Sequence, residues 1–187
     1  MASHGVCPWW VDFFATPFRR LMQDPAPIVV PYVHAGMTVL EPGPGMGFFT
    51  LELARLVGPS GHVIVVDVQR QMIAGLRRRA RRAGLLDRIE TRVVPPTSMG
   101  LDDVEGTVDF VFAFAVVHEM PGPAPFFSEA ARALKPGATL LLAEPAGHVD
   151  DQEFAGELAA AGQAGLTVVS HPSIRSCRTA LLCKPAA

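Results

Sequence analysis

Acidic and histidine side chains follow several apolar runs of this sequence, where they could bind a ligand or move a proton. Glu41 follows the run MTVL, Asp67 follows HVIVV, and Glu144 follows LLLA. His118 and Glu119 come directly after the run FVFAFAVV. Ligands of open parallel sheets bind outside the carboxyl ends of the strands, so we expect these side chains at one functional edge.

Three alternate glycines separate Glu41 from the next helical pattern. They are Gly43, Gly45 and Gly47, in the stretch EPGPGMGFF. Glycine has no Cβ, so such a turn can adopt unusual φ angles and let a ligand approach the main chain closely. The helix expected from about Phe48 to Val57 would aim its first N–H groups into the same crevice. The sequence therefore predicts a strand, tight turn, helix, strand unit.

The spacing of these residues distinguishes between two classes of ligand. A dinucleotide site reads G-x-G-x-x-G, with an acid about 20 residues further on for the ribose hydroxyls. Here the glycines read G-x-G-x-G, Glu41 precedes the first of them, and Asp67 still lies at the ribose distance. A negative charge ahead of the turn suits a cationic ligand better than a pyrophosphate.

On these residues the sequence resembles the class I S-adenosylmethionine-dependent methyltransferases, in particular the small single-domain, type 11-like members. Their first motif is an acid followed by alternate glycines, and the turn LKPG at 134–137 is frequent among them. The resemblance implies S-adenosyl-L-methionine as cofactor, with the glycine loop along its methionine part and Asp67 on its ribose hydroxyls. It also implies an α/β fold, a Rossmann-like doubly wound seven-stranded sheet with helices on both faces. That sheet is mostly parallel, with an antiparallel strand seven between strands five and six.

The turn after the third expected strand departs from the family's pattern. The family usually has an acid there that accepts from the adenine amino group, whereas residues 95–99 read PPTSM. The resemblance therefore leaves adenine to backbone groups, to the hydroxyl of Thr97 or Ser98, or to apolar contact from Val68. Ala115, in the turn after the fourth strand, is the remaining residue assigned to the cofactor.

His118 is the predicted catalytic base. The turn AVVHEMPG at 115–122 matches the family's motif after strand four, where cofactor and substrate meet. The unperturbed pKa of histidine, about 6.5, lets it accept a proton at neutral pH. The alternative is that His118 is structural and only closes the loop by hydrogen bonding. If the acceptor is a thiolate, no base is needed.

The first 36 residues are rich in aromatic side chains and predict a short helical lid over the substrate. Clustered large aromatics supply rigid apolar walls to small-molecule pockets. The alternative is a segment that packs its apolar face on the sheet. At 187 residues the chain has the size of one domain, with the lid at 1–36 and the core at 37–187. The residues predicted to contact substrate are Trp9, Trp10, Phe14, His118, Glu119, Glu144 and His148.

Composition argues against several other functions. The net charge of −2 creates no global field that would draw the protein to nucleic acid or membrane. Arginines cluster on the helix expected at 69–83, but one basic helix face in a slightly acidic chain indicates a solvated surface rather than a nucleic-acid site. The longest uncharged apolar run is far shorter than the roughly 20 residues that span a bilayer.

The cysteines and the first residues predict a cytoplasmic protein. Cys7, Cys177 and Cys183 are odd in number and lack the spacing of a metal site or a disulfide framework, so no metal is expected. The stretch MASHGVCPWW lacks the basic region and apolar core of a signal peptide.

The predicted function is transfer of a methyl group to a small-molecule acceptor by in-line displacement. One alternative is methylation of a thiol or an arsenite-like metalloid, suggested by Cys7 beside the tryptophans. Another is a non-catalytic regulatory protein that binds S-adenosylmethionine, suggested by the missing adenine acid. The intact glycines and Asp67 argue against this second alternative. The acceptor atom and the oligomeric state stay open.

Overall fold

The computed structural model describes residues 24–186, whose strands form one seven-stranded sheet. The strand order is β3-β2-β1-β4-β5-β7-β6. Strand β7 is antiparallel to both β5 and β6, whereas β1 with β2, β2 with β3 and β4 with β5 are parallel. The predicted fold, a mostly parallel Rossmann-like sheet with an antiparallel strand seven inserted between strands five and six, is confirmed.

The described residues divide into two compact units, 24–94 and 95–186. The first unit contains three parallel strands, three α-helices and a short 3-10 helix. They are α2 (Ala26–Val29), β1 (Thr38–Pro42), α3 (Thr50–Leu56), β2 (His62–Asp67), α4 (Arg70–Arg82), η1 (Leu86–Arg88) and β3 (Ile89–Val93).

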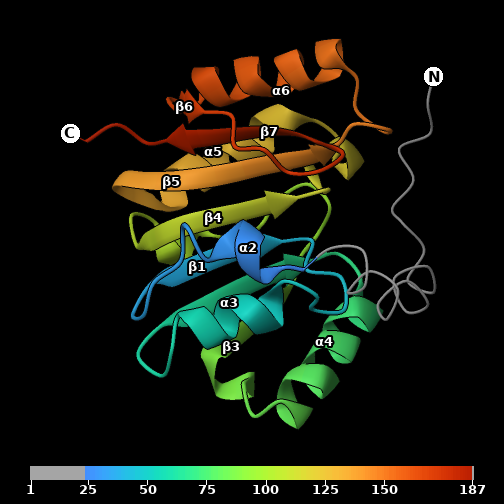
Figure 1. Ribbon diagram of the computed structural model, residues 1–187, viewed down its shortest axis with the longest axis vertical. Coiled ribbons are helices and arrows are strands. Elements are labelled where there is room, and N and C mark those ends of the chain that lie inside the picture. The colour runs from blue at the N-terminus through green and yellow to red at the C-terminus, as the bar shows by residue number, and fades with distance from the viewer. Residues whose placement is uncertain (1–23, 187) are drawn as a thin grey trace. The chain divides into compact units, whose positions relative to one another are not determined.

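The second unit contains the other four strands, two long helices and two short 3-10 helices. They are η2 (Asp102–Val104), β4 (Val108–Phe114), η3 (Val117–Glu119), α5 (Pro123–Ala133), β5 (Leu134–Pro145), α6 (Asp151–Gln163), β6 (Thr167–Ser170) and β7 (Cys177–Cys183). In Figure 1, β4 and β5 point the same way and β7 points back along them.

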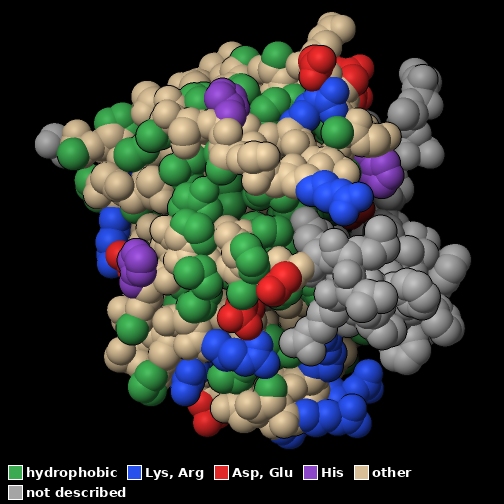
Figure 2. All heavy atoms as spheres, viewed as in Figure 1, with side chains coloured by type: hydrophobic (Ala, Val, Ile, Leu, Met, Phe, Trp, Pro, Cys, Tyr) green, Lys and Arg blue, Asp and Glu red, His purple; other side chains and the backbone are tan. Residues whose placement is uncertain are grey.

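The core forms where the sequence has continuous apolar runs. Residues Val63 to Val66 of β2 are all buried, as are Phe110 to Ala113 of β4, which is typical of strands covered on both faces. Helix α4 buries an apolar stripe at helical spacing and exposes most of its arginines, and Figure 2 shows basic side chains gathered over this helix. Helix α6 begins with a capping box formed by Asp150 and Glu153.

The N-terminal region differs from its prediction in one respect. Asp24 followed by Pro25 predicts a short helix that continues through Val33, but α2 covers only Ala26–Val29. Pro31 explains the early end, because proline has no N–H to continue the helical ladder. The lid residues Trp9, Trp10 and Phe14, and also Cys7, lie outside the described residues. Within 24–186, no helix is both long and apolar enough to cross a membrane.

Candidate cofactor site and active site

Glu41 lies at the carboxyl end of β1 with only 3% of its surface exposed. The Thr50 hydroxyl, at the start of α3, donates a hydrogen bond to its Oε2 at 2.6 Å. Burial raises the pKa of Glu41 to about 8, although the hydrogen bond from Thr50 works in the opposite direction. The carboxyl group is therefore mostly protonated at neutral pH, and a nearby ligand cation would favour its ionised form.

The three glycines after Glu41 adopt backbone conformations that other residues rarely take. Gly43, Gly45 and Gly47 have φ angles of +63°, +53° and +82°. The Gly43 N–H donates to the carbonyl of Val66 at 2.9 Å, which fixes the loop to the end of β2. A Cβ added at Gly47 would lie 3.1 Å from Cγ of Leu76, so a side chain at this position would also crowd α4.

Asp67 is the last residue of β2 and is largely buried. Its Oδ1 accepts a hydrogen bond from the Gln69 N–H at 2.7 Å, which holds the turn that follows. Pro42 pairs with Val66 in the parallel ladder, so Glu41 and Asp67 end neighbouring strands on the same side of the unit. Val68, the next residue, is 39% exposed, as a residue that contacts a ligand by apolar surface would be.

The loop after β3 is held by a carboxylate from α5 that the sequence analysis missed. The Ser98 hydroxyl donates to Oε2 of Glu129 at 3.2 Å, and the Met99 N–H donates to the same oxygen at 2.9 Å. Of the two hydroxyls assigned to adenine, that of Ser98 is thus engaged within the protein. Thr97 is exposed.

A left-handed residue directs the chain out of β4. The strand ends at Phe114, and Ala115 has a φ of +53°, which is uncommon for a residue with a Cβ. Its N–H donates to the carbonyl of Ala143 in β5 at 2.8 Å. The chain then enters η3, where His118 and Glu119 lie.

Glu144, fully buried near the end of β5, holds this turn in place. Its Oε1 accepts hydrogen bonds from the N–H groups of Val116 at 3.2 Å and Val117 at 2.8 Å. Its Oε2 contacts Nδ1 of His118. The carboxylate thus orients the imidazole ring and leaves Nε2 as the nitrogen that can accept a proton.

The charges around His118 favour its protonated form. The hydrogen bond with Glu144 raises the pKa of His118 above 6.5, burial opposes the rise, and the charges of Glu144, Glu119 and Glu157 add to it. The side chain of His118 is 20% exposed, whereas that of Glu144 is fully enclosed. A buried carboxylate behind a partly exposed imidazole is the arrangement that orients a general base in many enzymes.

Two further groups surround His118. The ring of His148 lies edge-on to that of His118, with the ring centroids 5.6 Å apart and an interplanar angle of 63°. Glu157 of α6 is buried, and its Oε2 has no hydrogen-bond partner within the described structure. Burial, and then the charge of Glu144, raise the pKa of Glu157 to about 8. Glu157 was missed by the sequence analysis, although it follows Phe154 at helical spacing on the apolar face of α6.

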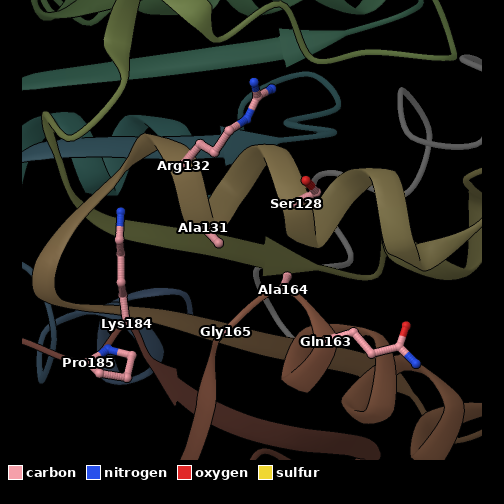
Figure 3. A pocket seen from close by; sticks show the side chains of 8 residues that line it. All are labelled: Ser128, Ala131, Arg132, Gln163, Ala164, Gly165, Lys184 and Pro185. Carbon is pink, nitrogen blue, oxygen red and sulfur yellow. The ribbon is translucent and has the colours of Figure 1, made fainter.

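The second unit also contains a hollow of about 510 Å³, which is lined by other residues (Figure 3). Its cations already have partners, since Arg132 pairs with Asp102 and Glu105 and the Lys184 ammonium donates to the carbonyl of Leu134 at 2.7 Å. It is lined by Ser128, Ala131, Arg132, Gln163, Ala164, Gly165, Lys184 and Pro185. None of the predicted site residues is among them. In the part of the chain that the structure describes, no group of three or more His, Cys, Asp or Glu side chains is arranged to hold a metal ion.

Comparison with known proteins agrees with this geometry. A family model described as a methyltransferase domain matches residues 33–173. The chain belongs to this methyltransferase family. A solved S-adenosylmethionine-dependent methyltransferase from Aquifex aeolicus is 26% identical, with a TM-score of 0.83 over 96% of this chain and 100% of that one. A [4+2]-cyclase, SpnF, is 18% identical with a TM-score of 0.70 over 92% of this chain and 82% of its own, and shows the fold alone.

Curated relatives match a shorter region. The ubiquinone/menaquinone biosynthesis C-methyltransferase of Pasteurella multocida is 31% identical over 112 residues, which are 60% of this chain and 41% of that protein. An uncharacterised 37.1 kDa transposon protein of Streptomyces fradiae is 33% identical over 110 residues, 59% of this chain and 30% of that protein. The matches thus span less than half the length of these relatives.

The predicted family, class I S-adenosylmethionine-dependent methyltransferases, and the predicted cofactor of that family are confirmed. The first unit fits such a cofactor, because it combines a buried carboxyl group, a glycine turn with three left-handed φ angles and a second acid at the end of β2. The roles of individual residues stay predictions.

Proposed function

We propose that this chain transfers a methyl group from S-adenosyl-L-methionine to a small-molecule acceptor that loses a proton as it is methylated. The observation that carries this proposal is His118, whose Nδ1 contacts the buried carboxylate of Glu144 while its side chain stays partly exposed. Such a histidine is oriented to accept a proton through Nε2. An acceptor that enters already deprotonated, such as a thiolate, would not need it.

Each group of residues has a separate task in this proposal. Glu41 and the glycines bind the methionine part of the cofactor, and Asp67 binds its ribose hydroxyls. The cofactor, when bound, supplies a methyl group on a positively charged sulfur that is already a good leaving group. Holding the acceptor in line with that methyl group can lower the barrier by about 7–11 kcal/mol. His118 then accepts the proton that the acceptor loses.

The negative charge of Glu144 stabilises His118 once it carries that proton. Both Glu144 oxygens are engaged by groups of the protein, and the side chain is fully buried. We therefore assign Glu144 the role of positioning His118 rather than that of touching substrate. Glu119 and His148, together with Trp9, Trp10 and Phe14, remain the proposed substrate contacts.

The names of the curated relatives suggest the class of acceptor. Several are C-methyltransferases of ubiquinone/menaquinone biosynthesis. Methylation of an activated aromatic carbon, or of a phenol oxygen, releases a proton, which is the case that requires a base. We propose an acceptor of this class. We also propose that residues 1–187 act as one methyltransferase domain, because the family match at 33–173 includes parts of both units.

The test is a screen for formation of S-adenosylhomocysteine with phenols, quinols, amines and thiols as acceptors. We expect turnover with a phenol or quinol, and we expect His118→Ala to reduce turnover at least about a hundredfold while S-adenosylmethionine still binds. His62→Ala, which removes a histidine at the start of β2, is the matched control and should keep full activity.

Two results would contradict the proposal. Turnover of thiols alone, unaffected by His118→Ala, would remove the role of the base. Failure of the wild-type protein to bind either S-adenosylmethionine or S-adenosylhomocysteine in a calorimetric titration would refute the proposed methyltransferase activity.

A further inference from the structure

We propose that Arg79 is a positioning residue for the cofactor loop. It fixes the carbonyl group of Met46 and thereby holds the glycine turn at 43–47 in the conformation that binds the cofactor. The identity of the ligand rests on the proposed function, whereas the hold on the loop rests on the structure of the first unit alone.

The central contact is a hydrogen bond from Arg79 Nη1 to the backbone carbonyl of Met46, at 2.7 Å. Met46 stands between Gly45 and Gly47, both of which have positive φ angles. The Met46 carbonyl belongs to the peptide that joins Met46 to Gly47, and a peptide next to a glycine can change orientation at low steric cost, so an external partner is needed to select one orientation. A guanidinium is well suited to this task because hydrogen bonds from a charged donor are about twice as strong as neutral ones.

Helix α4 also packs directly against the same loop. A Cβ added at Gly75 would lie 3.2 Å from Cγ and 3.4 Å from Sδ of Met46, so the absent side chain makes room for the methionine. A Cβ added at Gly47 would lie 3.1 Å from Cγ of Leu76, at the next position of the helix. Met46 is consequently buried. Arg79 lies one helical turn beyond Gly75, so its hydrogen bond and these two contacts come from one face of α4.

The arginines of α4 are not equivalent. Arg77 donates to the hydroxyl of Thr91 at 2.9 Å, on the neighbouring strand β3. Arg78, Arg81 and Arg82 are exposed. Arg79 is the only arginine of α4 for which the described structure gives a hydrogen bond to the glycine turn. Arg78 therefore offers a matched control, with the same charge on the same helix and no such bond.

This arrangement predicts an effect on binding and not on chemistry. A loop that is already held in its binding conformation loses less freedom when the ligand arrives. Loss of the hydrogen bond should weaken cofactor affinity about tenfold, as expected for removal of one charge-assisted bond. The rate at saturating cofactor should not change, because Arg79 holds the loop and has no part in the proposed proton transfer.

The experiment compares Arg79→Met, Arg79→Lys and Arg78→Met in the chain of 187 residues. Calorimetric titration with S-adenosylhomocysteine gives the affinity, and hydrogen exchange followed by mass spectrometry gives the protection of amides at 43–49. In the wild type, the Gly43 and Gly47 N–H groups are bonded to the carbonyls of Val66 and Pro44, so this segment should be protected. We expect weaker binding and faster exchange for Arg79→Met, partial recovery for Arg79→Lys, and wild-type behaviour for Arg78→Met.

Two outcomes would overturn the proposal. One is equal affinity in Arg79→Met and Arg78→Met. The other is weaker binding in Arg79→Met without faster exchange at 43–49, which would indicate a general effect of charge. If the wild-type protein binds neither cofactor form, the proposed function fails, but the exchange comparison still decides whether Arg79 holds the loop.

Discussion

Replacing Glu41 with glutamine should make the ligand-free protein more stable and its cofactor binding weaker. Glutamine keeps the shape of the side chain and can still accept the hydrogen bond from the Thr50 hydroxyl. It removes only the ionisable group. The buried carboxyl of Glu41 has its pKa raised to about 8, so the folded protein retains a proton there that the unfolded chain releases above pH 4.5.

The sign and size of the stability change follow from this difference in proton binding. Where the folded state binds more protons than the unfolded state, stability falls as pH rises. Below pH 4.5 the carboxyl of Glu41 is protonated in both states and does not lower the free energy of unfolding. Above that pH the free energy of unfolding falls, until the pH passes about 8. The whole interval corresponds to about 5 kcal/mol, of which about 3 kcal/mol has accumulated at pH 7. Glu41→Gln should recover that amount at pH 7 and nothing at pH 4.

Urea unfolding of the parent and Glu41→Gln at pH 4, 7 and 8 measures this difference in the free energy of unfolding directly. Glu52→Gln is the control, since Glu52 lies at the surface of α3 in an ion pair with Arg55 and should give a small difference that varies little with pH. Calorimetric titration should show weaker binding of S-adenosylhomocysteine to Glu41→Gln. A variant less stable than the parent by the same amount at all three pH values would refute the reasoning, because Glu41 would then be ionised in the folded protein.

Three other substitutions test the remaining acids. Asp67→Ala should weaken binding of S-adenosylhomocysteine at least about tenfold, since it removes a charged acceptor for ribose hydroxyls, and an unchanged affinity would disprove the ribose assignment. Glu144→Gln should lower the pKa of His118 toward 6.5 in an NMR titration, because the hydrogen bond to Glu144 is the main cause of its rise. In the same variant, turnover should begin to rise at a lower pH than in the parent. An unchanged pH profile of turnover would exclude His118 as the base. Glu157→Gln should stabilise the protein at pH 8 and not at pH 4. The gain should be roughly 2 kcal/mol, smaller than for Glu41 because Glu157 is less completely enclosed and solvent screens part of its interactions. Urea unfolding with no such pH dependence would contradict the burial of an uncompensated acid.

Sequence periodicity was sufficient for most elements that carry the site. The helix expected from about Phe48 to Val57 is α3 at Thr50–Leu56, and the helix expected at 69–83 is α4 at Arg70–Arg82. Such elements are predictable because burial on two faces of a strand, or one face of a helix, imposes a local pattern. The insertion of β7 between β5 and β6 has no such local signal and came from the family resemblance.

The groups that position the site were not predictable in this way. Arg79 bonds to Met46 across 33 positions of the chain, and Glu129 bonds to Met99 across 30. In the sequence, Arg79 is one of several arginines on a basic helix face and resembles its solvated neighbours. Only the tertiary structure shows which of them is directed at the loop, because a contact across 30 residues leaves no periodic trace in either segment.

Glu41 and Glu144 illustrate the same limit within one kind of motif. Each is a glutamate followed by proline at the end of a buried strand, and the sequence analysis placed both at a ligand-binding edge. The structure gives Glu41 one donor, the Thr50 hydroxyl, so burial dominates and its pKa rises to about 8. It gives Glu144 two backbone N–H donors and the Nδ1 of His118.

A carboxyl group with one partner can respond to a cation that arrives with the cofactor, whereas one with three partners is committed to the turn it holds. The number of donors around each acid, which depends on residues far away in the chain, therefore separates the proposed ligand contact from the proposed positioning residue.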